Sequence, residues 1–191
     1  MHLSEYELLE ALREPFCPVC SLARQAARSY LAGVIGGGVN DPTVREDWRR
    51  RGGLCPRHWR DARELESPAF SLAIIAEDLL GSRMNDSAEA PDCPACAVER
   101  DAEERYLQSL RQLPLEQVRR VLTEGHGFVC VRHRRRKPEG ELASILDERL
   151  ELILRDLAEF QRKYDYRFTD EPMGSEGDSW LRAIRALGGD V

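Results

Sequence analysis

Apolar residues recur at every third or fourth position through most of the chain, which is the spacing of a buried helix face. Two stretches share this spacing: the first carries Leu22, Ala26, Tyr30 and Val34, and the second carries Val98, Ala102, Tyr106 and Leu110. No segment shows the convincing alternation of apolar and polar residues that a half-buried strand needs. The pattern therefore predicts an all-α fold.

Capping and helix-breaking residues divide this pattern into separate helices. Asp41-Pro42 begins a short helix that Gly52-Gly53 ends, and Ser67-Pro68 begins another. A long helix is predicted over residues 142–163. Its expected inward side chains are Leu142, Ile145, Leu146, Leu150, Ile153, Leu154 and Leu157.

An internal repeat carries all six cysteines. The motif CPVC at 17–20 aligns with CPAC at 93–96, and CPRH at 55–58 aligns with CVRH at 130–133. The two motifs of one copy are separated by 34 residues in the first copy and by 33 in the second. Such self-similarity indicates two diverged copies of one structural unit.

The repeat and its flanking segments predict the domain organisation. We expect two pseudo-repeated helical modules, at 1–84 and 93–163, joined by the polar linker 85–92. Residues 164–191 form an acidic tail, expected to be extended except for a short helix over 180–187. The tail's aromatic residues, Tyr164, Tyr166, Phe168 and Trp180, are expected to anchor it across the helices.

The cysteines and two histidines have the spacing of metal ligands. Each module contains three cysteines, an odd number that disfavours disulfides, and three cysteines with one histidine complete a tetrahedral zinc site. We predict one zinc ion in each module, hence two per chain. The expected ligands are Cys17, Cys20, Cys55 and His58 in the first site and Cys93, Cys96, Cys130 and His133 in the second.

The prolines that follow three of the cysteines also support a metal site. Cys17, Cys55 and Cys93 each precede a proline, which favours the first position of a helix. The ligands would then lie at helix N-termini, where exposed N–H groups and the positive end of the dipole stabilise a zinc–thiolate centre. A closed set of four ligands leaves no position for a reactive water, so the pattern leans against an enzyme.

Three other interpretations stay open. A [4Fe–4S] cluster with one histidine ligand uses similar residues. The CPxC pairs also suit a thiol redox protein or redox sensor. Finally, two basic clusters are candidates for binding an anion or nucleic acid, although a solvated helix face explains them more simply: Arg49, Arg50, Arg51, Arg134, Arg135 and Arg136.

Net charge and hydropathy further limit the class of protein and its expected partners. The formal net charge is -6, which does not favour nucleic acid as the partner. No run approaches 18 apolar residues, and the N-terminus lacks the apolar region of a signal peptide. We expect a cytoplasmic protein without a membrane span, in a compartment where cysteines serve metals or redox chemistry more often than disulfides.

With these motifs in place, the chain resembles an uncharacterised bacterial family defined only as a domain of unknown function. The matching pieces are the NDP-x-VR segment at 40–45, the GxCxxH segment at 53–58 and the tail DYRFTDEPMGSEGDSW at 165–180. The second module departs from the family pattern because it lacks the NDP segment and has CVRH. The resemblance supports the repeated module and implies no activity. We therefore expect a zinc-binding interaction or regulatory protein with an unidentified protein partner, and the oligomeric state is left open.

Overall fold

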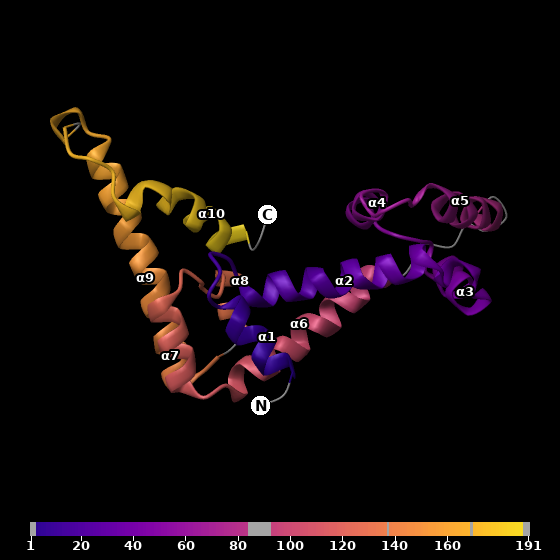
Figure 1. The fold of residues 1–191 in the computed structure, drawn as a ribbon, viewed down its shortest axis with the longest axis horizontal. Helices are drawn as coiled ribbons and strands as arrows, with labels where there is room; N and C mark the ends of the chain where they lie inside the picture. The colour runs from indigo at the N-terminus through magenta and orange to yellow at the C-terminus, as the bar shows by residue number, and fades with distance from the viewer. Residues whose placement is uncertain (1–2, 84–92, 137, 169, 189–191) are drawn as a thin grey trace. The chain divides into compact units, whose positions relative to one another are not determined.

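The computed structural model describes residues 3–83, 93–136, 138–168 and 170–188 (Figure 1). All regular elements within these residues are helical, which confirms the predicted all-α class. The α-helices are α1 Leu3–Ala11, α2 Pro18–Gly36, α3 Pro42–Arg51, α4 Pro56–Arg63, α5 Ala69–Arg83, α6 Pro94–Gln112, α7 Leu115–Glu124, α8 Val131–Arg134, α9 Gly140–Lys163 and α10 Ser179–Gly188. Three short 3-10 helices are η1 Gly38–Asn40, η2 Tyr166–Phe168 and η3 Ser175–Asp178.

The repeat is visible in the order and length of the helices. Both α2 and α6 begin at the proline of a CPxC motif and are 19 residues long. Both α3 and α7 have 10 residues, and α4 and α8 begin directly after the cysteine of a CxxH motif. The sequence pattern had not indicated α7, whose N-cap residue is Pro114.

The chain divides into two compact units. Unit 1 comprises residues 1–22 and 104–191, and unit 2 comprises residues 23–103. This division differs from the expected sequential modules, since its boundaries fall inside α2 and α6. The expected linker at 85–92 lies outside the described residues.

The core of unit 2 forms around an aromatic cluster. Trp48 of α3 is 1% exposed, and its Nε1 donates a hydrogen bond of 2.7 Å to the hydroxyl of Tyr30 on α2. The rings of Trp48 and Trp59 meet edge to face, with centroids 6.2 Å apart. Leu54 and Leu79 belong to the same buried cluster, which also includes cysteines. The core therefore extends directly to the candidate ligands.

Unit 1 is assembled from segments far apart in sequence. Helix α1 packs against α7, and α7 packs against α9. Fully buried side chains from these helices and the loop before α8 form the core, including Leu8, Leu12, Val118, Phe128 and Leu146. Tyr106 of α6 is buried too, and its hydroxyl donates a 2.7 Å hydrogen bond to Glu7 of α1.

The expected helix faces are correct in part. The predicted row on α6 is largely buried, at Ala102, Tyr106 and Leu110. On α2 the most buried row is displaced from the predicted one and comprises Val19, Ala23, Ala27 and Leu31, with the predicted Val34 also buried. On α9, Leu154 is 64% exposed rather than inward. An apolar spacing alone does not distinguish the centre of a helix face from its edge.

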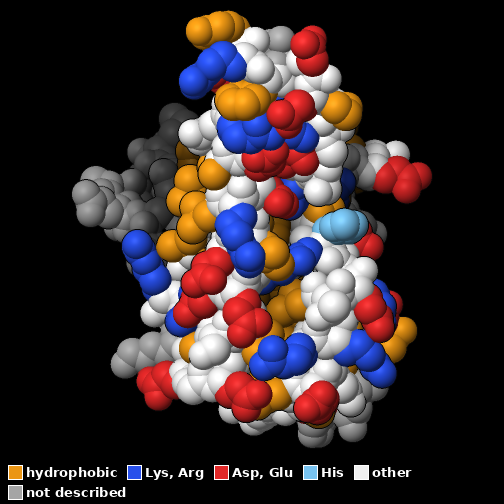
Figure 2. Space-filling view, turned by 90° about the vertical axis from the view of Figure 1, so that its left-hand side faces the viewer, with side chains coloured by type: hydrophobic (Ala, Val, Ile, Leu, Met, Phe, Trp, Pro, Cys, Tyr) orange, Lys and Arg blue, Asp and Glu red, His pale blue; other side chains and the backbone are white. Residues whose placement is uncertain are grey.

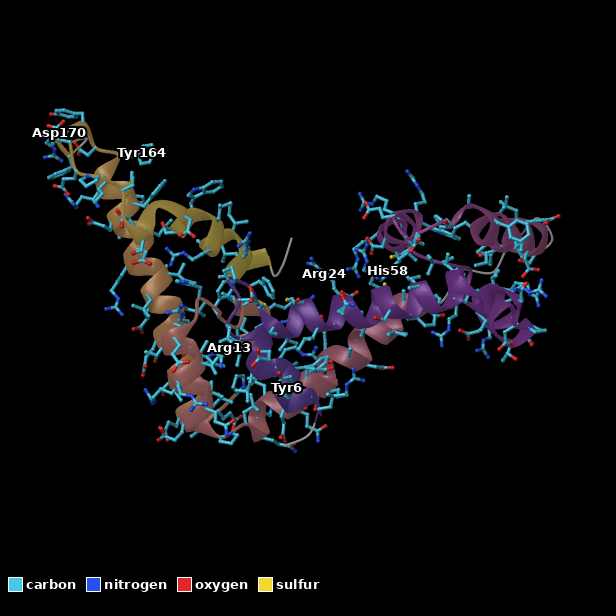
Figure 3. The ribbon with its side chains drawn as sticks, viewed as in Figure 1. Tyr6, Arg13, Arg24, His58, Tyr164 and Asp170 are labelled. Atoms are coloured by element: carbon cyan, nitrogen blue, oxygen red, sulfur yellow. The ribbon has the colours of Figure 1, made fainter. Side chains whose placement is uncertain are left out.

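Ion pairs hold the tail, and the expectation of aromatic anchors is correct only in part: Phe168 is half-buried, and the guanidinium of Arg162 lies 4.5 Å from its ring centre. Tyr164 and Tyr166 are 71% and 84% exposed, and Figure 3 shows Tyr164 projecting from the end of α9. Lys163 Nζ instead contacts Glu176 Oε1 at 2.6 Å, and Arg182 contacts Asp156 at 2.9 Å. The tail is also less extended than expected, because η2 and η3 interrupt it before α10.

Candidate metal centres

All eight predicted ligands gather into two groups of three cysteines and one histidine, each compact enough to hold a metal ion. One group contains Cys17, Cys20, Cys130 and His133, and the other contains Cys55, His58, Cys93 and Cys96. Within each group the ligand atoms lie within 4.8 Å of one another. We call the first the long-range site and the second the short-range site, after the chain length between their ligands.

The predicted pairing of the ligands was wrong. Each CPxC motif was expected to join the CxxH motif of its own copy, but it joins the CxxH motif of the other copy. The ligand pairs are therefore nested along the chain: the first pairs with the fourth, and the second with the third. The residue types and the closed count of four are as predicted, and only the partners are exchanged.

Helix length explains the exchange. At about 1.5 Å per residue, the 19 residues of α2 extend for about 28 Å, whereas the 10 residues of α3 extend for about 15 Å. Helix α3 is thus too short to carry the chain back to the start of α2, where Cys17 lies. The same argument applies to α6 and α7. The CxxH motif of each copy therefore joins the CPxC motif of the other copy.

Helix N-termini supply the ligands, as predicted from the prolines. Cys55 and Cys130 are the N-cap residues of α4 and α8, and Cys17 and Cys93 immediately precede α2 and α6. Each site therefore joins two helix N-termini, α2 with α8 or α4 with α6. The free N–H groups and the positive dipole end of each helix stabilise thiolates at these positions.

The long-range site is fully enclosed within unit 1. All four of its residues are buried, with Cys17, Cys130 and His133 at 0% exposure. Nδ1 of His133 lies 3.4 Å from Cys17 Sγ, and 3.3 Å from both Cys20 Sγ and Cys130 Sγ. The sulfurs of Cys20 and Cys130 are 3.7 Å apart.

A glycine loop positions the second half of this site, and the sequence reasoning missed it. A Cβ at Gly127 would lie 2.0 Å from the carbonyl oxygen of Leu12, so only glycine permits the loop to pass the turn before Cys17. Arg149 of α9 secures the loop by donating to the carbonyl oxygens of Gly127 at 3.0 Å and Gly125 at 2.7 Å. His126 in this loop is exposed, and its backbone N–H donates a hydrogen bond to the carbonyl oxygen of Arg13. The GHG sequence was the available signal.

The short-range site is more accessible. His58 and Cys93 are buried, but Cys55 and Cys96 are only half-buried. Nδ1 of His58, labelled in Figure 3, lies 3.4 Å from all three sulfurs. Cys55 Sγ and Cys96 Sγ are 3.7 Å apart. The turn before Cys55 uses Gly53 at φ 84°, where an added Cβ would meet Leu79 at 2.8 Å.

The two histidines have different neighbours on the ring nitrogen that faces away from the sulfurs. His58 Nε2 lies 3.6 Å from a carboxylate oxygen of Glu99, which Arg57 holds through both of its oxygens. His133 Nε2 instead lies 3.2 Å from the guanidinium of Arg132. A carboxylate behind a ligating histidine orients the ring and increases its basicity. The short-range site has this feature and the long-range site has an arginine in its place.

The thiols of each site have opposed pKa shifts. Burial raises the pKa of Cys17 well above its usual value, whereas hydrogen bonds from Cys17 and Cys20 lower the pKa of Cys130 to about 3. Burial also raises the pKa of Cys96 to about 12, while at Cys55 burial is outweighed by the N–H groups of α4 and neighbouring thiols, and its pKa falls. In each site the pKa of one thiol is lowered while that of another is raised. A divalent cation removes this conflict because it favours the thiolate of every ligand.

A comparison with curated proteins places the chain among its relatives. It is 30% identical over 183 residues to an uncharacterized 23.9 kDa protein in the xynA 3' region of Caldicellulosiruptor sp. (strain Rt8B.4), covering 84% of this chain and 88% of that protein. The chain belongs to the same family as this protein. No family model matches the chain. No solved structure matches it either. The family relationship supports the expected bacterial resemblance and carries no activity.

The arginines of the two basic clusters in this chain are mostly paired with acidic side chains. Arg49 pairs with Asp78 at 2.7 Å, and Arg50 and Arg51 both pair with Asp47. In unit 1, Arg134 pairs with Asp147 and Arg136 pairs with Glu104. Figure 2 likewise shows acidic and basic side chains interspersed over the face it displays. These pairs reduce the positive potential available to an anionic ligand.

Among the residues that the structure describes, no helix combines the length and apolar character needed to cross a membrane.

Proposed function

We propose that the protein binds two zinc ions at structural Cys3His sites and serves as an interaction or regulatory component rather than as an enzyme. The observation that carries this proposal is the spacing of the ligand atoms. A tetrahedral zinc ion with bonds of about 2.3 Å to sulfur and 2.0–2.1 Å to nitrogen separates two sulfurs by about 3.8 Å, and sulfur from nitrogen by about 3.5 Å. The corresponding separations are 3.7 Å and 3.3–3.4 Å.

The ligand set supports zinc over an iron–sulfur cluster. The four ligands of a [4Fe–4S] cluster bind four different iron atoms, so they must lie farther apart than ligands that share one ion. Here all ligand atoms of a site lie within 4.8 Å. This spacing suits a single ion, and three thiolates with one imidazole favour zinc among the common single metals.

The chemistry of a closed site supports a structural role. With four protein ligands, the ion has no open position at which to activate water or substrate. A neutral imidazole is the form that binds metal, and burial together with the charge of Arg57 lowers the pKa of His58. The free energy of metal binding then contributes to folding, since each site joins helices separated in the chain.

The thiol redox alternative has less support as the main function. The sulfurs of Cys20 and Cys96 lie as close to cysteines of the CxxH motifs as ligands of one ion do. A simple CPxC dithiol gives no reason for that proximity. Anion binding by the arginine clusters is also less favoured, because five of the six arginines have acidic partners.

Elemental analysis of protein purified without added metal tests the proposal. We expect two zinc ions per chain, with no iron and no acid-labile sulfide. Slow alkylation of the six cysteines, accelerated by a chelator, should accompany this result. Protein without zinc, or protein containing iron and sulfide, would contradict the proposal.

A further inference from the structure

The short-range site has an accessible edge made of two cysteines. Cys55 and Cys96 are half-buried, whereas Cys93 and His58 of the same site are buried. All four residues of the long-range site are buried as well. A small oxidant in solution therefore reaches the sulfurs of one site more readily than those of the other, since oxidation of cysteine depends on exposure.

The two accessible sulfurs are also close enough to react with each other. Cys55 Sγ and Cys96 Sγ are 3.7 Å apart, and they come from different helices, Cys55 at the start of α4 and Cys96 in the first turn of α6. A disulfide needs an S–S distance of about 2.05 Å. The sulfurs must therefore approach by less than about 2 Å for the bond to form.

We propose that the short-range site is a reversible oxidation site, at which a peroxide converts Cys55 and Cys96 to a disulfide and releases the zinc ion, while the long-range site keeps its own. This inference rests on the proposed zinc function. It adds that the two sites have different roles: the long-range site stabilises the fold, and the short-range site responds to oxidant.

The reaction balances with hydrogen peroxide as the oxidant. One thiolate attacks a peroxide oxygen, so that an S–O bond forms, the O–O bond breaks and hydroxide leaves. The second thiolate then attacks the sulfenic sulfur, so that the S–S bond forms, the S–O bond breaks and a second hydroxide leaves. The two sulfurs together lose two electrons, the peroxide gains them, and two protons from solvent convert the hydroxides to water.

Loss of two thiolates explains the release of the ion. The remaining ligands, His58 and Cys93, provide only two of the four positions of a tetrahedral zinc site. A thiol reductant reverses the step by exchange with the disulfide, after which zinc binds again.

The test uses the full chain with its metal and hydrogen peroxide as the probe. Zinc per chain is measured first, and two ions at this stage confirm the proposed function independently of the oxidation. Peroxide is then added with a chromogenic zinc chelator, and disulfides are mapped by mass spectrometry. We expect release of one zinc ion, a Cys55–Cys96 disulfide, and recovery of two ions after treatment with dithiothreitol and zinc.

Two variants sharpen this test. Cys55→Ser should abolish the disulfide and retain only the ion of the long-range site, which peroxide should not release. Arg135→Ala, a surface change outside both ligand sets, should behave like the unmodified chain. Simultaneous release of both ions, a disulfide containing Cys17, Cys20 or Cys130, or irreversible oxidation without a disulfide would overturn the proposal. Disulfide mapping on the unmodified chain tests the proposal even if the serine variant fails to fold.

Discussion

The long-range and short-range sites use the same four ligand types but lie in different environments. The first is fully buried and has Arg132 behind its histidine, whereas the second has two half-buried cysteines and Glu99 behind its histidine. The first joins residues 110 positions apart, and the second joins residues 41 apart. The two copies of the motif have therefore kept the same residue types but differ in burial and in the group behind the histidine, so the two candidate sites have different environments.

The largest expected effect comes from removing one ligand of either site. Cys20→Ser and Cys96→Ser should each lose one zinc ion and roughly 5 kcal/mol of folding free energy, lowering the melting temperature by about 10–20 °C. Calorimetry with zinc analysis provides the measurement. Equal melting temperatures of both variants and the unmodified chain would refute a structural role.

The glycine turns before Cys130 and Cys55 allow the two sites to be perturbed separately. Gly127→Ala forces a Cβ against the backbone of Leu12 and should cost about 2–3 kcal/mol. Gly53→Ala, at positive φ and against the more adaptable side chain of Leu79, should cost about 1–3 kcal/mol.

Gly33→Ala serves as the matched control for these two variants. It lies within α2 with open space around the added Cβ, and alanine there should stabilise the helix by about 0.5–1 kcal/mol. Each turn variant should weaken zinc at the site it precedes and leave the other ion in place, as measured by chelator competition. Loss of both ions together would show that the sites are not independent.

Replacing the carboxylate behind His58 should have a smaller effect, confined to one site. Glu99→Gln keeps the side-chain shape but removes the charge that orients the imidazole, so zinc affinity at the short-range site should fall about 10–100-fold. Glu104→Gln, an exposed acid paired with Arg136, is the matched control and should not change zinc affinity. An unchanged zinc affinity in the Glu99 variant would show that the carboxylate behind His58 does not distinguish the two sites.

The smallest effect is expected in the tail, which belongs to neither site. The N–H of Gly174 and the ammonium of Lys163 lower the pKa of Glu176 to about 2. Because the folded pKa lies below the usual value near 4.5, this contact stabilises the tail above about pH 4.5 and is lost as the pH falls toward 2. Glu176→Gln should increase hydrogen exchange over residues 170–178 at pH 7 without changing zinc content. Unaltered exchange would mean that other contacts hold the tail.

The residues of the sites could be predicted from sequence, but their partners could not. CPxC and CxxH are local patterns, and proline next to cysteine indicates a helix start, so all eight ligands and their positions at helix N-termini were predictable. The pairing depends on where α3 and α7 place the CxxH motifs that follow them, and the sequence pattern did not predict α7. The pairing follows from a comparison of helix lengths: α2 and α6 are longer than α3 and α7, which follow them.

The tail shows a second limit of sequence reasoning. Aromatic residues in a polar segment suggested anchors, but ion pairs also hold the tail, Lys163 with Glu176 and Arg182 with Asp156. The partners are 13 and 26 residues apart, so no local spacing identifies them. Likewise, the role of Arg149 depends on a loop more than 20 residues away. Polar contacts of this kind follow from the folded path of the chain rather than from periodicity.

The nested order of the ligands has a consequence for the protein's synthesis. All four residues of the short-range site have been translated once Cys96 is made, so this candidate site can be completed while the rest of the chain is still being produced. Cys20 must wait for Cys130, which follows 110 residues later. At about 5–20 residues per second, the first cysteine pair spends roughly 5–20 s without its partners. During that interval Cys17 and Cys20 lie on a growing chain without Cys130 and His133, so the long-range site is the last of the two to be completed.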